Sequence, residues 1–233
     1  MITFTKRDSK FWEDHYNEKG LSNNEGKMNA RRSVQLSEFS YMFKDINHAL
    51  KFENNDIVAD VGCAGGGVSV LFSSLVKKVF AYDIANENIA YYKRTHAADN
   101  IEFTHGYIEK ANNTEINKML LGAVLQHLSE DQLESFAESI CSKVQFPNLE
   151  RVFISHIPDL LKQHVWLDGY KNFISNKKEL EEMRFNWKNY STWYDFEDLK
   201  KYFEKEFDVV ISEVNKHVVQ HKYCFDILLI RKN

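Results

Sequence analysis

The chain has 233 residues, 43% of them hydrophobic, with a formal net charge of -4 at pH 7 and a pI of about 6.2. This length is enough for one sizeable core and short for two independent ones, so we expect a single domain over residues 1–233. The acidic balance gives no general attraction to nucleic acid or to an anionic membrane, and we predict neither as a partner.

Targeting and metal signals are also missing from the sequence. No charged-then-apolar leader opens it, and no apolar run approaches the roughly 20 residues that span a bilayer, which favours a cytoplasmic protein. The three cysteines are widely spaced and indicate buried free thiols. The nine histidines lack the spacing of metal ligands, so no metal site is predicted. No pattern indicates an oligomeric state.

Residues 1–50 are predicted to form a helical cover at the N-terminus. An aromatic helix around residues 11–16 precedes a polar loop at residues 20–26, and a second helix carries apolar side chains at helical spacing from Phe39 to Leu50. We expect that second helix to fold over a ligand. The aromatic helix has two interpretations, because its rings either line a substrate site or only anchor the N-terminus to the core.

The most informative stretch is an apolar strand at residues 57–61 that runs into a glycine turn. Small residues at Gly62, Ala64 and Gly66 let the backbone turn tightly and bring its amides close to a ligand. A helix follows at once, with apolar residues at helical spacing over residues 68–75. Strand, turn and helix together predict a cofactor loop, whereas a glycine cluster alone is a weak signal that also occurs in tight turns without a ligand.

The second strand, at residues 78–83, ends in an acid. Asp83 lies 21 residues after Gly62, where a doubly wound unit places the carboxylate that accepts hydrogen bonds from ribose hydroxyls. The charge of Asp60 indicates which class of cofactor the loop binds. A carboxylate two residues before the first glycine would repel a pyrophosphate, whereas S-adenosylmethionine (SAM) presents an ammonium group, so the residues favour SAM over a dinucleotide.

The pattern Asp60-x-Gly62-x-Ala64-x-Gly66 resembles motif I of the class I SAM-dependent methyltransferases, with Ala64 in place of the usual middle glycine. The resemblance runs roughly from Phe11 to the C-terminus, although only residues 56–83 are specific. It implies an α/β fold with a Rossmann-like seven-stranded sheet of order 3-2-1-4-5-7-6, the last strand antiparallel, helices on both faces and a helical aromatic cap. It also implies a SAM-binding core at residues 51–158.

Two further segments extend the cofactor site by resemblance. Residues 106–108 follow a predicted strand at 101–105, where family members flank the adenine. Residues 121–127 begin within a predicted strand at 118–124 and resemble the motif IV region beside the reacting centre. The full set of cofactor residues that the resemblance implies is Tyr16, Asp60, Gly62, Cys63, Ala64, Gly66, Asp83, Ile84, Gly106, Tyr107, Ile108 and Gly122.

The second half of the chain completes the predicted sheet. A helix in the 130s begins after a Ser129 N-cap, a buried strand covers residues 151–156, and a helix covers residues 196–203. Two β-rich runs at 207–214 and 223–230 then flank a linker without helical periodicity and predict an antiparallel hairpin, so residues 195–233 form a C-terminal helix and hairpin.

Residues 159–194 are longer than a simple connection needs and are rich in aromatic and basic side chains. We predict that they form a cap that sets the acceptor, while the alternative is that the rings only pack the cap itself. The residues concerned are Trp166, Tyr170, Phe173, Phe185, Trp187, Tyr190, Trp193 and Tyr194, with Lys162, Lys171, Arg184 and Lys188.

Two histidines are candidates for the base that takes the acceptor proton. His127 follows the fourth strand and His156 ends the fifth, at the carboxyl edge where open α/β sheets bind ligands, and His127 is the first choice. The alternative for each is a hydrogen-bonded histidine at the boundary of the core. Because in-line alignment supplies most of the acceleration, such a base need only remove one proton.

The sequence lacks two motifs of methyltransferases that act on nucleic acids, and this limits the classes of methyl acceptor. The only prolines are Pro147 and Pro158, so there is no Pro-Pro run typical of adenine-amine methyltransferases and no Pro-Cys nucleophile. We predict a small polar acceptor, methylated at a hydroxyl ahead of an amine. Residues 157–159 resemble methyltransferases of bacterial surface-polysaccharide synthesis, which implies a sugar or nucleotide-linked glycan precursor.

Three alternatives remain open from the sequence. An aminopropyltransferase shares the expected fold, but residues 122–124 replace its acidic motif. A nicotinamide-dependent oxidoreductase or epimerase is opposed by Asp60 and by the terminal hairpin. A protein that binds SAM without transferring a methyl group is compatible with Ala64.

Overall fold

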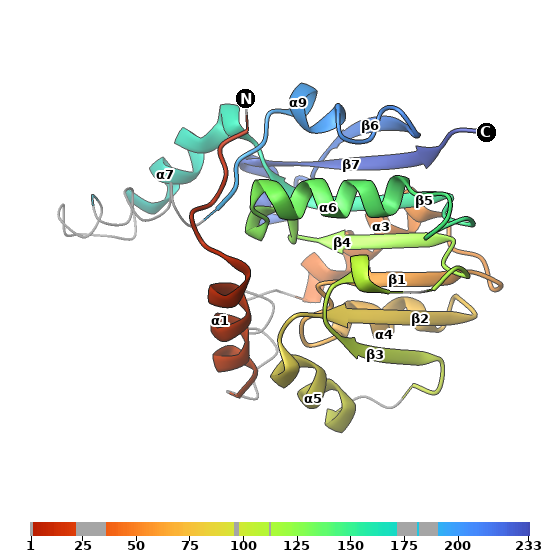
Figure 1. Cartoon of the computed structure of the whole chain (residues 1–233). Coiled ribbons are helices and arrows are strands. Elements are labelled where there is room, and N and C mark those ends of the chain that lie inside the picture. The colour runs from red at the N-terminus through yellow and green to blue at the C-terminus, as the bar shows by residue number, and fades with distance from the viewer. Residues whose placement is uncertain (1, 22–35, 96–97, 112, 172–180, 182–190) are drawn as a thin grey trace.

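The computed structural model describes residues 2–21, 36–95, 98–111, 113–171, 181 and 191–233 (Figure 1). Its centre is a seven-stranded sheet of order β3-β2-β1-β4-β5-β7-β6, as predicted. The strands are β1 (Ile57–Val61), β2 (Lys78–Asp83), β3 (Ile101–His105), β4 (Lys118–Gly122), β5 (Arg151–Pro158), β6 (Phe207–Glu213) and β7 (Cys224–Arg231).

The sequence of each central strand explains its place in the sheet. β1, β2 and β4 are short, apolar and buried on both faces, as parallel strands covered by helices must be. They pair in parallel with one another and with β3 and β5, so their carboxyl ends share one edge. β7 runs antiparallel to both β5 and β6, which confirms the predicted hairpin.

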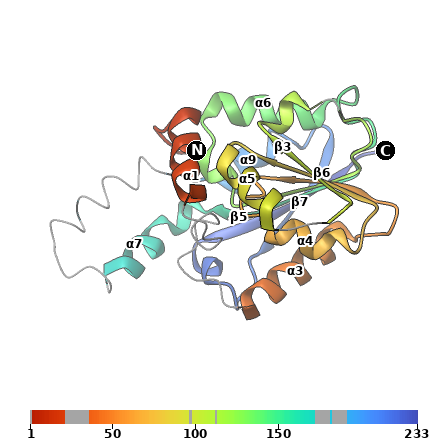
Figure 2. The same cartoon turned by 90° about the horizontal axis from the view of Figure 1, so that it is seen from below.

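Helices cover the sheet on both faces, which gives three layers (Figure 2). The helices α3 (Leu36–Leu50), α4 (Gly67–Ser73) and α5 (Asn86–Thr95) pack on one face. The helices α6 (Glu130–Cys141) and α9 (Phe196–Lys200) pack on the other, over the larger apolar core. α6 begins with the predicted Ser129 cap, which forms a reciprocal capping box with Gln132.

Helix α1 (Ser9–Leu21) stands beside the carboxyl ends of the strands, next to α5 (Figure 1). Asn17 Oδ1 accepts a hydrogen bond from the Glu87 backbone N–H at 3.1 Å, at the start of α5. Gly20 was expected in a loop, but it lies in α1 and is buried against α5. A methyl group at this position would come within 2.7 Å of Glu87 Cβ, so a larger residue would push the two helices apart. The glycine therefore permits the close contact between the two helices.

The opposite edge of the sheet holds a buried ion pair. Lys118 Nζ lies 2.5 Å from Asp56 Oδ2 and donates a further hydrogen bond to the Lys51 carbonyl at 2.7 Å. Asn117 Nδ2 donates to the other Asp56 oxygen at 2.8 Å. Both charged residues are almost fully buried, so their mutual pairing is required where these strands begin.

Several predicted boundaries differ from the structure. β4 ends at Gly122, β5 continues to Pro158, and α9 ends at Lys200 rather than at residue 203. The linker expected to lack helical structure contains a 3-10 helix, η4 (Val219–Lys222). Cys63 and Cys224 are buried free thiols as predicted, whereas Cys141 is only partly buried. In the described part of the chain, no helix is both long enough and apolar enough to cross a membrane.

Half of the predicted cap, residues 172–180 and 182–190, lies outside the described residues, so its role stays a prediction. Its first part is the 3-10 helix η3 (Leu160–Lys162) and the helix α7 (Gln163–Lys171), and its last residues, Trp193 and Tyr194, are fully buried. The cap residues outside the description are Phe173, Arg184, Phe185, Trp187, Lys188 and Tyr190.

Candidate functional site

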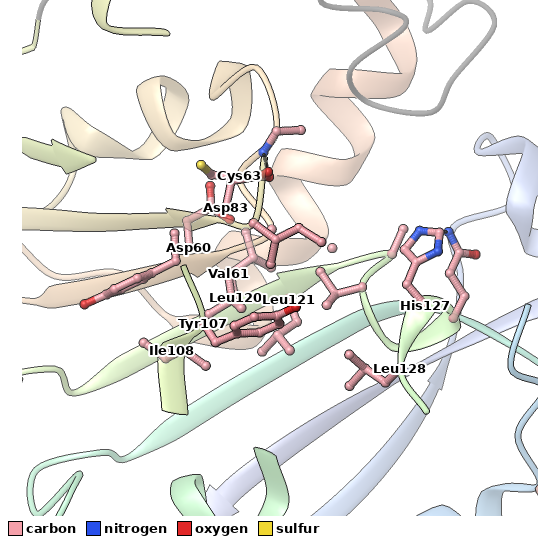
Figure 3. Close-up of a pocket in the computed structure, with 18 of the residues that line it drawn as sticks. Asp60, Val61, Cys63, Asp83, Tyr107, Ile108, Leu120, Leu121, His127 and Leu128 are labelled. Carbon is pink, nitrogen blue, oxygen red and sulfur yellow. Dashed lines mark hydrogen bonds between the residues drawn. The ribbon is translucent and has the colours of Figure 1, made fainter. Parts of the chain in front are cut away.

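A cavity of about 170 Å³ opens at the carboxyl edge of the sheet (Figure 3). It lies between the loops after β1, β2, β3 and β4 and the side chains of α1 and α3. The sequence-predicted residues that line it are Tyr16, Asp60, Gly62, Cys63, Ala64, Asp83, Ile84, Gly106, Tyr107, Ile108, Gly122 and His127. Gly66 and His156 are not among its lining residues.

The glycine turn after β1 has the backbone that its sequence predicts. Gly62, Ala64 and Gly66 all have positive φ, of 73°, 49° and 75°. The amides of Gly62 and Cys63 donate to the Tyr82 carbonyl at 2.8 and 3.0 Å, which ties the turn to β2. Gly66 supports the turn from behind, because a methyl group there would lie 1.4 Å from the Tyr92 ring. The glycine therefore admits that ring behind the turn, and its contact with the cofactor stays a prediction.

Asp83 is buried at the end of β2, and its carboxylate accepts three hydrogen bonds, two from backbone amides and one from a side chain. Its Oδ2 accepts from the Ala64 amide at 2.8 Å, and its Oδ1 accepts from the Ala85 amide at 2.8 Å and from Asn88 Nδ2 at 3.2 Å. Burial raises the pKa of Asp83, and these hydrogen bonds oppose that rise. An ionised carboxylate offers about four acceptor positions, so capacity remains for a ligand hydroxyl.

Asp60 is the second carboxylate of the cavity. Its Oδ2 accepts from the Ser69 hydroxyl at 2.5 Å, and the side chain is 3% exposed. Burial raises the pKa of Asp60 to about 7, against the lowering effect of the Ser69 hydrogen bond. A cation bound beside it would favour the ionised form, so the carboxylate is suited to an ammonium group.

The loop after β3 forms a more apolar part of the cavity. Gly106, with φ of 127°, donates its amide to the Asp83 carbonyl at 2.9 Å, and a methyl group on it would meet no atom within 4 Å. The 3-10 helix η1 (Ile108–Lys110) follows and buries Ile108. Two carboxylates at one end and apolar side chains beside them match a nucleoside with an amino-acid tail.

His127 lies across the cavity from the two carboxylates (Figure 3). It ends the 3-10 helix η2 (Leu125–His127), which follows β4. Its Nε2 is 3.0 Å from the Tyr16 hydroxyl and 3.1 Å from Gln126 Nε2, and its ring centroid is 4.1 Å from that of Trp12. Within the described residues, no hydrogen-bond partner reaches its buried Nδ1.

Burial controls the charge of this imidazole. It lowers the pKa of His127 to about 3, with smaller contributions from Lys19 and His15. Burial, with a further contribution from Asp83, also raises the pKa of Tyr16. At neutral pH the pair is therefore an uncharged imidazole and an uncharged phenol.

The segment at residues 191–194 holds η2 in place. The Thr192 amide donates to the Gln126 carbonyl at 2.8 Å, and its hydroxyl donates to the Leu128 carbonyl at 2.7 Å while accepting from the Thr5 amide at 2.9 Å. Tyr194 adds a hydrogen bond from its hydroxyl to the Leu125 carbonyl at 2.7 Å. One short stretch thus fixes both the N-terminal segment and the loop that carries His127.

The same stretch closes the ends of the predicted cap. The Tyr194 amide donates to the Pro158 carbonyl at 2.9 Å, and the Leu160 amide donates to the Tyr194 carbonyl at 2.9 Å. Asp159 and Tyr194 form an isolated parallel bridge. The first and last residues of the cap are therefore adjacent, beside the end of β5.

Sequence reasoning missed several cavity residues. Gln126, Gln132 and Ser155 line the cavity but were not proposed. Gln126 could have been found as the neighbour of His127, whereas Ser155 gave no signal, because its orientation depends on an irregularity in β5 that strand alternation does not indicate.

Comparisons with known proteins agree with the fold that holds this cavity. A methyltransferase-domain family model matches residues 58–145, which run from β1 to just beyond α6. No curated protein matches the sequence.

Several solved structures share the fold at low sequence identity. The magnesium protoporphyrin IX methyltransferase of Synechocystis PCC 6803 with bound SAH is 13% identical, with a TM-score of 0.67 over 97% of this chain and 100% of that chain. The N-methyltransferase NodS of Bradyrhizobium japonicum WM9 is 12% identical, with a TM-score of 0.60 over 86% of this chain and 100% of that one. The PH0226 protein of Pyrococcus horikoshii OT3 is 16% identical, with a TM-score of 0.59 over 84% and 90%.

Proposed function

We propose that the chain is a class I SAM-dependent methyltransferase that transfers the methyl group of SAM to a hydroxyl of a small polar acceptor. A methyltransferase-domain family model matches residues 58–145, and solved methyltransferases share the fold, which supports this proposal. The observation that supports this most is the pairing, in one cavity, of a carboxylate-lined cofactor end with a neutral, buried histidine. SAM supplies the activated methyl group. The residues of the chain have to bind it, orient the acceptor, exclude water and remove one proton.

The cofactor end divides into recognisable parts. Asp83 is proposed to accept from the ribose hydroxyls, and Asp60 to face the ammonium group. Tyr107 and Ile108 are proposed to flank the adenine, with Ile84 and Gly106 beside them. The turn amides, together with Gly122 and Tyr16, are proposed to contact the methionine portion.

His127 is proposed as the base that receives the acceptor proton. Its depressed pKa keeps the imidazole neutral at neutral pH but also makes it a weak base in the resting protein, so proton uptake has to be coupled to the loss of the sulfonium charge. A sulfonium loses its positive charge as the methyl group leaves, and the proton taken up by His127 returns one positive charge to the cavity. The buried cavity therefore keeps its net charge through the reaction, which offsets the cost of forming an imidazolium there.

The acceptor is proposed to be a sugar or a nucleotide-linked glycan precursor, on the resemblance of residues 157–159 to polysaccharide-associated methyltransferases. A hydroxyl is favoured over an amine because an amine is protonated at neutral pH and has to lose that proton before it can attack. The basic cap residues, Lys162 among them, are proposed to meet the phosphates of such a precursor.

The test is a transfer assay with methyl-tritiated SAM and a panel of free hexoses, nucleotide hexoses, glycerol phosphate and small amines. We expect a methylated hydroxyl compound, identified by mass spectrometry. His127→Ala should lower turnover roughly 100-fold or more, the range of general-base catalysis, while the Kd for SAM stays within about twofold. His221→Ala is the matched control, because its ring hydrogen-bonds the Val218 carbonyl outside the cavity.

Each other result has a distinct meaning. Unchanged turnover in His127→Ala would remove it as the base. Methylated amines without methylated hydroxyls would overturn the acceptor class. Binding of SAM with no transfer to any panel member would favour a SAM-binding protein without catalysis, and stabilisation by NAD alone would favour the oxidoreductase.

A further inference from the structure

A β-bulge interrupts β5 beside the cavity. Ile154 pairs with Ile227 and Ile157 with Phe225, so Ser155 and His156 together oppose one residue of β7. That opposing residue is Asp226, and His156 adopts φ of 60°, a left-handed conformation that is costly for a side chain with a Cβ. Bulges beside active sites re-aim side chains, and strained residues gather where function requires them.

The bulge is held by a buried hydrogen-bonded group. The His156 amide donates to Asp226 Oδ1 at 2.7 Å, and the His156 ring places Nδ1 3.1 Å from the Ser155 hydroxyl oxygen. All three side chains are at most 5% exposed. Asp226 therefore holds the strained backbone of His156, and the imidazole of the same residue contacts the Ser155 hydroxyl.

His156 itself faces a second, much smaller cavity. That cavity has a volume of about 10 Å³, and Asp45 and Asp226 line it with His156. Such a volume holds about one water molecule and no acceptor. Ser155 is different, because it lines both this cavity and the large one. Ser155 is the polar side chain that the two cavities share, so it offers a hydrogen-bonded route from His156 to the large cavity.

The sheet order places Ser155 on the acceptor side. Ser155 pairs with Gly122 in the neighbouring β4, and its hydroxyl would lie 3.8 Å from a methyl group on Gly122. The carboxylates Asp60 and Asp83 belong to β1 and β2, on the other side of β4. A cofactor held by those carboxylates leaves the region above β4 and β5 for the acceptor.

We propose that Ser155 hydrogen-bonds the methyl acceptor and that His156 is a positioning residue that fixes the direction of the Ser155 hydroxyl. When His156 Nδ1 accepts the Ser155 hydroxyl hydrogen, the lone pairs of the serine oxygen are left for the large cavity. When Nδ1 instead donates to the serine oxygen, the hydroxyl hydrogen is left for that cavity. Either way one polar group is directed at the acceptor, which selects an acceptor with a second hydroxyl or amine near the attacking oxygen. This inference rests on the proposed methyl transfer.

The experiment compares Ser155→Ala, Ser155→Thr, His156→Asn and the double variant Ser155→Ala/His156→Asn in the full chain. Kinetics are measured on the panel compound that the wild type methylates fastest, and SAM binding is measured separately by calorimetry. We expect the acceptor KM to rise roughly tenfold or more in Ser155→Ala, the loss of one hydrogen bond, and to recover in Ser155→Thr. His156→Asn should raise the acceptor KM too, and the double variant should resemble Ser155→Ala, because the two act as one unit.

An acceptor KM that stays at the wild-type value in Ser155→Ala would overturn the inference. It would also be overturned if the rise in acceptor KM in the double variant equalled the product of the rises in the two single variants. A second arm needs no acceptor: nitrogen-15 NMR of the histidine rings with bound SAH should show the His156 Nδ1 resonance moving in Ser155→Ala. If the wild type binds SAM but methylates nothing, the proposed function fails and the acceptor role of Ser155 fails with it. The resonance then tests the other half of the inference, and a resonance that does not move would overturn the positioning of Ser155 by His156.

Discussion

Replacing Asp83 by alanine should remove most of the stabilisation that SAM gives the protein. If the carboxylate accepts from both ribose hydroxyls, its loss removes hydrogen bonds to a charged group, together worth about 3 kcal/mol, or roughly a 150-fold rise in the Kd. With SAM at 100 times the wild-type Kd, stabilisation is about 2.7 kcal/mol. After that rise in the Kd, the same concentration gives only about 0.3 kcal/mol.

Thermal unfolding measures this difference directly. For a domain of this size each kcal/mol moves the Tm by about 2–4 °C, so the shift should fall from about 5–11 °C to about 1 °C. Asp83→Ala also leaves the Ala64 and Ala85 amides without their partner, which lowers the Tm of the ligand-free protein. Each shift is therefore taken from the variant's own ligand-free Tm.

Asn88→Ala is the matched control for Asp83. It removes the 3.2 Å hydrogen bond to the same carboxylate while leaving the carboxylate in place, so the SAM shift should persist. A full SAM shift in Asp83→Ala would refute the assignment of the ribose to this residue. Equal loss in both variants would show that the local loop structure, and not the carboxylate, determines binding.

Three further changes test the surrounding structure. Gly66→Ala should lower the Tm and abolish SAM binding, because its methyl group meets the Tyr92 ring at φ of 75°; normal unfolding and binding would contradict this. The raised pKa of Asp60, about 7, means that the folded state favours the proton, so this group's contribution to stability falls as pH rises from about 4 to 7. Urea unfolding should show that fall in the wild type and a smaller one in Asp60→Asn, and identical pH profiles would disprove it. Lys118→Met leaves Asp56 buried without its cation and should cost about 3–5 kcal/mol by urea unfolding, whereas Lys118→Met/Asp56→Leu should regain much of it.

The fold and the cofactor end could be predicted from the sequence because their signals are local. The glycine turn, Asp60 before it and Asp83 at the end of the next strand lie within one strand–helix–strand unit, and short-range periodicity identifies its elements. The strand order was predicted by resemblance, and the structure confirms it.

The acceptor side could not be predicted in the same way, because its contacts join distant segments. Thr192 reaches η2 over 64 residues to Leu128, and Tyr16 reaches His127 over 111. His156 was placed at the end of a regular strand, but the bulge opposite Asp226 turns it into a separate small cavity. Neither hydrophobic periodicity nor motif spacing contains information about such pairings.

The hydrogen bonds between Pro158, Leu160 and Tyr194 have a consequence for how this protein could change its substrate. They fix the two ends of the intervening segment side by side on the framework, whatever that segment contains. Exchanging it for one of twice the length would add only about 0.6 kcal/mol of loop-closure cost. If this segment sets the acceptor, as we propose, a chimera with a different sequence at residues 161–190 should change the acceptor preference and keep the wild-type affinity for SAM.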